Sequence, residues 1–275
     1  MIIGVTGGKG GTGKTFFAVN LAVALSKLGK KVTYLDCDAD CPSAHFLFGA
    51  ELEDKKQVTS FVPEFDDSKC TKCGKCASAC QYNALYQLKD SVPTLVPNVC
   101  NGCKACQVVC PSDAIYEHKK TVGWTYETKC GGIELFSGEL KPSDPLSERM
   151  VDAIKKRGMA NSDAGYIIVD TAAGAHCPVV AALRGCDEAF AVTEPTLFGE
   201  HDFRIISSLL NSLKIPFKTV MNRSTLTKKK IEADVSIPYD EKVFESYVRG
   251  IPLVGMHPEH EISKEFLELA KRLGK

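Results

Sequence analysis

The sequence predicts an α/β fold: a doubly wound, mostly parallel sheet with a second, smaller module inserted into the chain. Two patterns predict the sheet. Short apolar runs alternate with helix-like stretches, as strands and crossover helices do, and a glycine-rich loop separates the first apolar run from the first helix. A third pattern predicts the insert: eight of the 13 cysteines fall between residues 59 and 120, in two similar halves.

The expected elements follow from hydrophobic periodicity. Residues 2–6 form an apolar strand, and residues 14–28 form a helix that Gly29 ends. The apolar positions of this helix lie on one face: Phe17, Leu21, Ala24, Leu25 and Leu28. Further strands are expected at 32–36, 166–170, 189–193 and 218–222. Runs this continuously apolar indicate strands buried on both faces, whereas residues 123–144 show no clear pattern.

Composition limits the classes of function. The chain has 275 residues, 44% of them hydrophobic, and a formal net charge of +0, so no global charge attracts it to nucleic acid or to a membrane. We expect no signal peptide before the first strand and no membrane span, hence a cytoplasmic location. Because disulfides are uncommon there, 13 cysteines indicate metal binding rather than bridges.

The loop GGKGGTG, residues 7–13, fits two motifs. As G-x-G-x-x-G it would bind a dinucleotide, with Asp36 or Asp38 as the acidic residue that follows about 20 positions later. As G-x-x-x-x-G-K-T it would be a phosphate-binding P-loop, with Lys14 for the phosphate charge and Thr15 for Mg²⁺. The P-loop is favoured, because the dinucleotide motif has no use for Lys14 and Thr15 at the start of the helix.

The stretch K-G-G-x-G-K-T resembles the deviant P-loop of the MinD, nitrogenase iron protein, ArsA and Mrp ATPases. In that group the extra lysine reaches the nucleotide of a second subunit. The resemblance therefore implies an ATP-dependent homodimer joined through Lys9, which would have no function in a monomer; the alternative is a solvated loop lysine. It implies Lys9, Lys14 and Asp38 as catalytic residues, and an ATP-binding set of Gly8, Lys9, Gly10, Gly11, Thr12, Gly13, Lys14, Thr15 and Asn222.

Two more segments resemble the same family. In LDCDADCPSAHFLFG, residues 35–49, Asp38 would orient or activate the attacking water, and Asp40 would lie near Mg²⁺ through its hydration shell. In YIIVDTAAG, residues 166–174, Asp170 would complete a Mg²⁺ site with Thr15 and Asp40. Asn222 and the segment after Ile237–Pro238 would contact the adenine base. The alternatives are a helix cap for Asp170 and a turn cap for Asn222.

The cysteine spacing C-x2-C-x2-C-x3-C occurs twice and is typical of bacterial two-cluster ferredoxins, in which the fourth cysteine of each run ligates the other cluster. The sequence thus predicts two [4Fe–4S] clusters in an α+β ferredoxin-like insert. The first would bind Cys70, Cys73, Cys76 and Cys110, and the second would bind Cys80, Cys100, Cys103 and Cys106. Zinc usually takes two C-x2-C pairs across a longer gap. Gln81 replaces the usual proline after Cys80.

Three features outside these motifs have two interpretations each. Cys177 follows Asp170 at an offset similar to that of a cluster ligand in the nitrogenase iron protein, so it could form an intersubunit metal site, or it could simply pack. The lysine run 228–230 is interpreted as a solvated loop and not a nucleic-acid site. The amphipathic C-terminal segment is expected to pack on the sheet; a membrane helix is the alternative.

Together these patterns predict a discontinuous P-loop ATPase domain, residues 1–58 and 121–275, with the ferredoxin-like insert at 59–120. The predicted cofactors are ATP, Mg²⁺ and two [4Fe–4S] clusters. The predicted function couples the nucleotide state to electron transfer, or to assembly of an iron–sulfur or other metal cofactor on a redox or metal-cofactor partner protein. The alternative is a MinD-like positioning or scaffold ATPase in which the clusters are structural.

Overall fold

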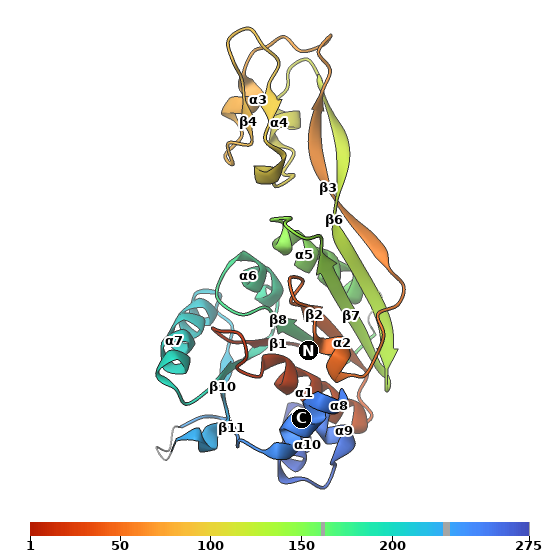
Figure 1. Ribbon diagram of the computed structural model, residues 1–275, viewed down its shortest axis with the longest axis vertical. Coiled ribbons are helices and arrows are strands. Elements are labelled where there is room, and N and C mark those ends of the chain that lie inside the picture. The colour runs from red at the N-terminus through yellow and green to blue at the C-terminus, as the bar shows by residue number, and fades with distance from the viewer. Residues whose placement is uncertain (161–162, 228–231, 275) are drawn as a thin grey trace. The chain divides into compact units, whose positions relative to one another are not determined.

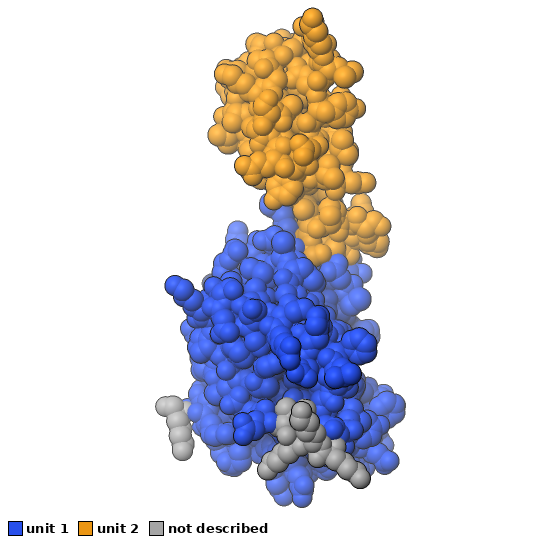
Figure 2. Space-filling view, turned by 90° about the vertical axis from the view of Figure 1, so that its left-hand side faces the viewer, with its two compact units in different colours: residues 1–56, 125–139, 148–275 blue, residues 57–124, 140–147 orange. Residues whose placement is uncertain are grey.

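The computed structural model describes residues 1–160, 163–227 and 232–274. The chain divides into two compact units (Figure 2): residues 1–56, 125–139 and 148–275, and residues 57–124 and 140–147. The predicted insert, 59–120, falls within the second unit. The lysine run 228–230 lies outside the described residues.

The first unit is built on a mostly parallel sheet, part of a nine-stranded sheet in the order β11-β10-β9-β1-β8-β2-β7-β6-β3. The strands that neighbour one another from β11 to β7 run parallel. Their bounds are β1 (Ile2–Thr6), β2 (Val32–Cys37), β7 (Ile133–Leu140), β8 (Tyr166–Thr171), β9 (Glu188–Thr193), β10 (Phe217–Asn222) and β11 (Val235–Ile237). The predicted mostly parallel α/β fold and its five predicted strands are confirmed.

Helices cover both faces of this sheet (Figure 1). On one face Tyr34 packs in a core with helix α1 (Lys14–Lys27), and on the other face Leu35 lies beside helix α5. With α1 lie α8 (Glu241–Arg249), α9 (Leu253–Met256) and α10 (Glu261–Leu273); with α5 (Ser147–Ala160) lie α6 (Cys177–Leu183) and α7 (Leu197–Ser212). Two short elements, α2 (Ala44–Leu47) and the 3₁₀ turn η2 (Ser224–Leu226), follow β2 and β10.

Helix α10 packs against helix α1 and beside Val235 and Ile237 of β11, in the layer of helices that covers this face of the sheet, as expected. The Phe266 ring centroid is 5.4 Å from that of Phe17 and 6.0 Å from that of Phe16. The apolar face of the helix is therefore covered by another helix of the same chain: Ile262, Phe266 and Leu269 are each 2% exposed. In the part of the chain that the structure describes, no helix is long and apolar enough to cross a membrane.

The stretch 123–144 forms a hairpin that the sequence analysis left unassigned. Strand β6 (Ile115–Cys130) turns through Gly131 and Gly132 into β7, which lies next to β2. Both glycines have positive φ, 53° and 85°, as a two-residue hairpin turn of type I′ requires. This hairpin extends the parallel sheet by β6 and β3 (Lys56–Phe65), the strands through which the chain enters and leaves the second unit.

The second unit repeats its backbone conformation at an offset of 30 residues. Helix α3 (Lys75–Ser78) corresponds to α4 (Ala105–Val108), and positive φ angles recur in pairs at Lys72 and Gly102, Gly74 and Lys104, and Asn83 and Asp113. The hydrogen bonds repeat as well: Val96 N–H donates to Ala84 O, and Asp66 N–H donates to Ala114 O. The other elements are β4 (Leu85–Tyr86), β5 (Thr94–Leu95) and the 3₁₀ turn η1 (Pro97–Val99).

Candidate nucleotide-binding site and cysteine cavities

The phosphate loop joins β1 to α1 at the carboxyl end of the parallel strands, where this architecture places its ligands. Gly13 precedes the helix with φ of 94°, a left-handed conformation that a side chain would strain. Backbone N–H groups at the start of a helix favour anions. The loop therefore has the geometry of a phosphate cradle.

Lys14 lies inside this cradle and is only 7% exposed. Its Nζ donates to the carbonyl oxygen of Lys9 at 3.2 Å. Burial lowers the pKa of Lys14, and the negative charges of Asp170 and Asp38 oppose that effect. A buried ammonium needs hydrogen-bond or charge partners, and a phosphate in the cradle would be one.

Asp170 lies one residue before the end of strand β8 and is 1% exposed. The Tyr34 hydroxyl donates to Asp170 Oδ2 at 3.0 Å, whereas Oδ1 is buried without a hydrogen-bond partner among the described residues. Burial raises the pKa of Asp170, and Thr15 and Lys14 are among the neighbours that lower it. A carboxylate oxygen left without a partner beside a threonine hydroxyl fits the hydrated Mg²⁺ of a P-loop.

Asp36 and Asp38 differ in burial and in their hydrogen-bond donors. Asp36 is buried, and its carboxylate accepts hydrogen bonds from the backbone N–H groups of Ser43 and Ala44, both at 3.1 Å. It therefore organises the loop after β2 and is not free for the ribose that the dinucleotide alternative requires. Asp38 is partly exposed and accepts from Cys41 N at 3.3 Å; burial raises its pKa, against the opposing charge of Lys14.

Asp40 is exposed, two residues beyond Asp38 on the same loop. Its charge raises the pKa of Asp38. The charges of Asp170 and Asp38 act on Lys14, whereas the charge of Asp40 acts on Asp38. The placement of Asp40 near Mg²⁺ therefore stays a prediction.

A pocket lies beside the phosphate loop at the ends of β10 and β11. Aromatic side chains and the Asn222 amide line it, together with residues from the segment after Ile237: Phe16, Asn222, Arg223, Pro238, Tyr239, Asp240, Val243, Phe244 and Tyr247. Such a mixture of aromatic walls and a few polar groups is typical of a site for a planar ligand. Asn222 Nδ2 donates to Thr12 O at 2.8 Å, so this side chain is bonded to the phosphate loop.

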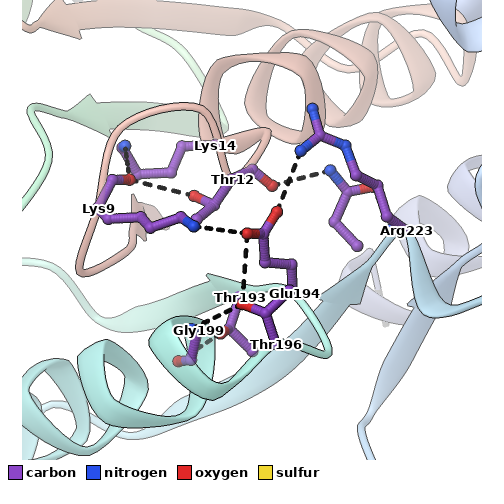
Figure 3. A network of polar contacts seen from close by, with 9 residues as sticks. Lys9, Thr12, Lys14, Thr193, Glu194, Thr196, Gly199 and Arg223 are labelled. Carbon is purple, nitrogen blue, oxygen red and sulfur yellow. Dashed lines mark hydrogen bonds and ion pairs between the residues drawn. The ribbon is translucent and has the colours of Figure 1, made fainter. Parts of the chain in front are cut away.

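Lys9 has an ion-pair partner in its own chain, and its expected role across a dimer stays a prediction. Its Nζ lies 2.6 Å from Oε1 of Glu194, which follows strand β9 (Figure 3). Glu194 is 7% exposed, and its Oε2 also accepts from Arg223 at 3.0 Å. Neither Glu194 nor Arg223 was singled out from the sequence. An acidic residue directly after a parallel strand was the available signal.

The second unit contains two cavities, each lined by four cysteines that the spacing rule assigns to one cluster. The first cavity is lined by Cys70, Cys73, Cys76 and Cys110. The second is lined by Cys80, Cys100, Cys103 and Cys106. In each cavity the last cysteine of one run therefore lies with the first three cysteines of the other run, and which cysteines ligate a cluster stays a prediction. Among the described residues, no group of three or more His, Cys, Asp or Glu side chains has the geometry to hold a single metal ion.

Backbone donors point at some of these sulfurs. Lys72 N–H donates to Cys70 Sγ at 3.4 Å, and Ala114 N–H donates to Cys110 Sγ at 3.3 Å. Hydrogen bonds of this kind stabilise thiolates and tune the potentials of iron–sulfur clusters. Cys177 is outside this unit: it is exposed and begins helix α6.

Comparison with known proteins places the chain in a family. Residues 3–253 match the CobQ/CobB/MinD/ParA nucleotide binding domain. The uncharacterized protein MJ0579 of Methanocaldococcus jannaschii is 36% identical over 251 residues, which covers 91% of this chain and 90% of that protein. The iron-sulfur cluster carrier protein of Aquifex aeolicus is 58% identical, but over only 52 residues, 19% of this chain and 14% of the relative.

A solved structure has the same fold. It is the septum site-determining protein MinD of Pyrococcus horikoshii OT3, complexed with Mg-ADP, with a TM-score of 0.62 and 20% identity, covering 100% of this chain and 96% of that one. At this identity the likeness shows the fold, and the family match extends over most of the sequence. The chain therefore belongs to the CobQ/CobB/MinD/ParA family of P-loop nucleotide-binding proteins.

Proposed function

We propose that the chain binds and hydrolyses ATP as a homodimer and carries two [4Fe–4S] clusters, whose electron transfer, or use in cofactor assembly on a partner protein, depends on the nucleotide. The observation that carries the proposal is the pair of four-cysteine cavities within a chain of a nucleotide-binding family. Each cavity is lined by the four cysteines predicted to bind one cluster, and thiolates are the ligands of such clusters. When bound, the clusters would supply one-electron chemistry.

In the nucleotide site the residues would act through position and charge. Lys14 would bind the β- and γ-phosphates, and Thr15 and Asp170 would hold Mg²⁺, with Asp40 acting through water. Asp38 would orient the attacking water, and Lys9 would reach the nucleotide of a second copy. Asn222 and the aromatic pocket beside it would bind the base.

The exposure of the cysteines favours electron transfer over a purely structural role for the clusters. Cys73 lines the first cavity and Cys103 lines the second, and both are exposed. A cluster held there would approach the surface, where a redox partner can dock. The MinD-like alternative would need α10 for membrane binding, and its apolar face is covered by α1.

The test is anaerobic purification with iron, sulfide and nucleotide analysis, followed by size-exclusion chromatography with Mg-ATP or Mg-ADP. We expect about eight iron and eight sulfide per chain and a dimer with ATP but not with ADP. The Lys14→Ala variant should keep its iron and lose nucleotide binding. A colourless protein, or nucleotide binding by Lys14→Ala equal to that of the wild type, would contradict the proposal.

A further inference from the structure

Glu194 is a nearly buried carboxylate shared by two cations from separate segments (Figure 3). Lys9 comes from the phosphate loop and lies 2.6 Å from Oε1, and Arg223 follows β10 and lies 3.0 Å from Oε2. Lys9 is 35% exposed and Glu194 is 7% exposed. A carboxylate this buried depends on its partners, since removing all of them would leave an uncompensated charge.

Glu194 is an anion in this arrangement. Burial acts to raise its pKa, but the hydrogen bond and charge of Lys9 and the charge of Arg223 outweigh burial and hold the pKa below its ordinary value. The attraction to Lys9 is therefore present throughout the neutral pH range.

The Lys9 backbone is held in place by Lys14, the residue that a bound phosphate would also contact. Its carbonyl oxygen accepts from Lys14 Nζ at 3.2 Å and from the Thr12 hydroxyl at 3.4 Å. The P-loop lysine binds the outer phosphates of a nucleotide. A triphosphate would compete with the Lys9 carbonyl for the Lys14 ammonium, so nucleotide binding would weaken one of the two hydrogen bonds that hold the segment presenting Lys9 to Glu194.

We propose that Glu194 is a positioning residue that holds Lys9 within its own chain until a triphosphate occupies the loop. Arg223 permits the release, because it keeps Glu194 paired after Lys9 has left. The inference rests on the proposed function, in which Lys9 then reaches the nucleotide of a second copy. It predicts that loss of the Glu194 charge and loss of the Arg223 charge have opposite effects on dimer formation.

The test measures the ATP concentration that gives half-maximal dimer, by light scattering after size-exclusion chromatography, beside the ATP affinity of each monomer. Glu194→Gln frees Lys9 and should lower that concentration about tenfold, whereas Arg223→Gln should raise it about tenfold, because Lys9 would leave a buried carboxylate unpaired. Glu200→Gln is the control: Glu200 is exposed and pairs with Arg204 on the same helix at 2.7 Å, so no shift is expected.

A second measurement uses the nucleotide-free chain. Labelling of lysine amines, read by mass spectrometry, should modify Lys9 slowly in the wild type and in Glu200→Gln, and faster in Glu194→Gln. Shifts of the same sign for the Glu194 and Arg223 variants, no shift, or unchanged labelling of Lys9 would overturn the inference while the wild type still dimerises with ATP. If the wild type itself stays monomeric with ATP, the proposed function fails, and the inference falls with it.

Discussion

The side-chain amide of Asn222 rests directly against Gly13. Asn222 Nδ2 donates to the carbonyl of Thr12 at 2.8 Å, and a Cβ on Gly13 would collide with Nδ2. Gly13 also has a φ of 94°. Asn222, at the end of β10, therefore fixes the shape of the phosphate loop. This contact links the candidate base pocket to the phosphate cradle.

This contact predicts the effect of Gly13→Ala. The new methyl group would face both the collision with Asn222 and an unfavourable φ, so the free energy of unfolding should fall by about 2–4 kcal/mol. Chemical denaturation measures it. Gly10→Ala is the matched control for stability, because a Cβ at Gly10 meets nothing within 4 Å and should cost little. Equal losses in the two variants would refute this account of the loop.

The buried carboxyl of Asp170 predicts a pH dependence. Because burial raises its pKa in the folded state, the folded state retains a proton that the unfolded state releases above an ordinary Asp pKa of about 4. The nucleotide-free chain should therefore lose stability as the pH rises from that value toward neutrality. In Asp170→Asn this loss should shrink by at least about 1 kcal/mol.

Thermal unfolding at pH 4.5, 5.5 and 7.0 checks this prediction, because the loss falls between the unfolded pKa of about 4 and the folded pKa of about 6. The control is Asp152→Asn, which changes an exposed aspartate on α5 and should keep the wild-type slope. The same slope for the Asp170 variant and the wild type would show that burial does not raise the pKa of Asp170.

The crossed lining of the two cavities predicts which cluster each cysteine serves. Cys110→Ser should disturb the cluster of the cavity that Cys110 shares with Cys70, and leave the other spectrum unchanged. Cys80→Ser should do the reverse. Iron should fall toward about half of the wild-type content in each variant, as iron analysis and electron paramagnetic resonance can show.

The control for the cysteine variants is Cys186→Ala, which removes a buried thiol of the first unit and should keep the full iron content. If Cys110→Ser instead altered the cluster bound by Cys100 and Cys103, the ligands would not cross and the assignment would be wrong.

The packing of α10 predicts a stability effect at Phe266, in the middle of the helix. Phe266→Ala should cost about 3–5 kcal/mol, because its ring is 2% exposed against Phe16 and Phe17. Val248→Ala, on a side chain that is 72% exposed, should cost less than about 0.5 kcal/mol. Denaturant unfolding compares them. ATP-dependent binding of the wild type to liposomes, lost on removal of α10, would instead favour the MinD-like alternative.

The parallel strands and the phosphate loop could be predicted because each has a strong local signal. The apolar runs at β1 and β8 are continuous, and Lys14 and Thr15 stand at the start of a helix. Residues 123–144 were harder, because β6 is long, crosses from one unit to the other and alternates only partly. The pair Gly131 and Gly132 was the usable signal for its hairpin.

The partners of the site residues could not be predicted, because they join segments far apart in the chain. Glu194 lies 185 positions from Lys9, and their contact exists only once β9 and the phosphate loop meet at one edge of the sheet. The burial that raises the pKa of Asp170 likewise comes from the assembled core. The cysteine runs could be recognised without knowledge of the fold, because three cysteines of each predicted set are near neighbours in sequence.

The central claim is that the nucleotide state governs the clusters, and the most direct measurement is their reduction potential in the anaerobic wild-type protein. It is recorded by electron paramagnetic resonance titration with Mg-ADP and with a non-hydrolysable ATP analogue, and repeated with Lys14→Ala. We predict different potentials with the two nucleotides in the wild type and no difference in Lys14→Ala. Identical potentials and identical cluster accessibility with both nucleotides would contradict the account.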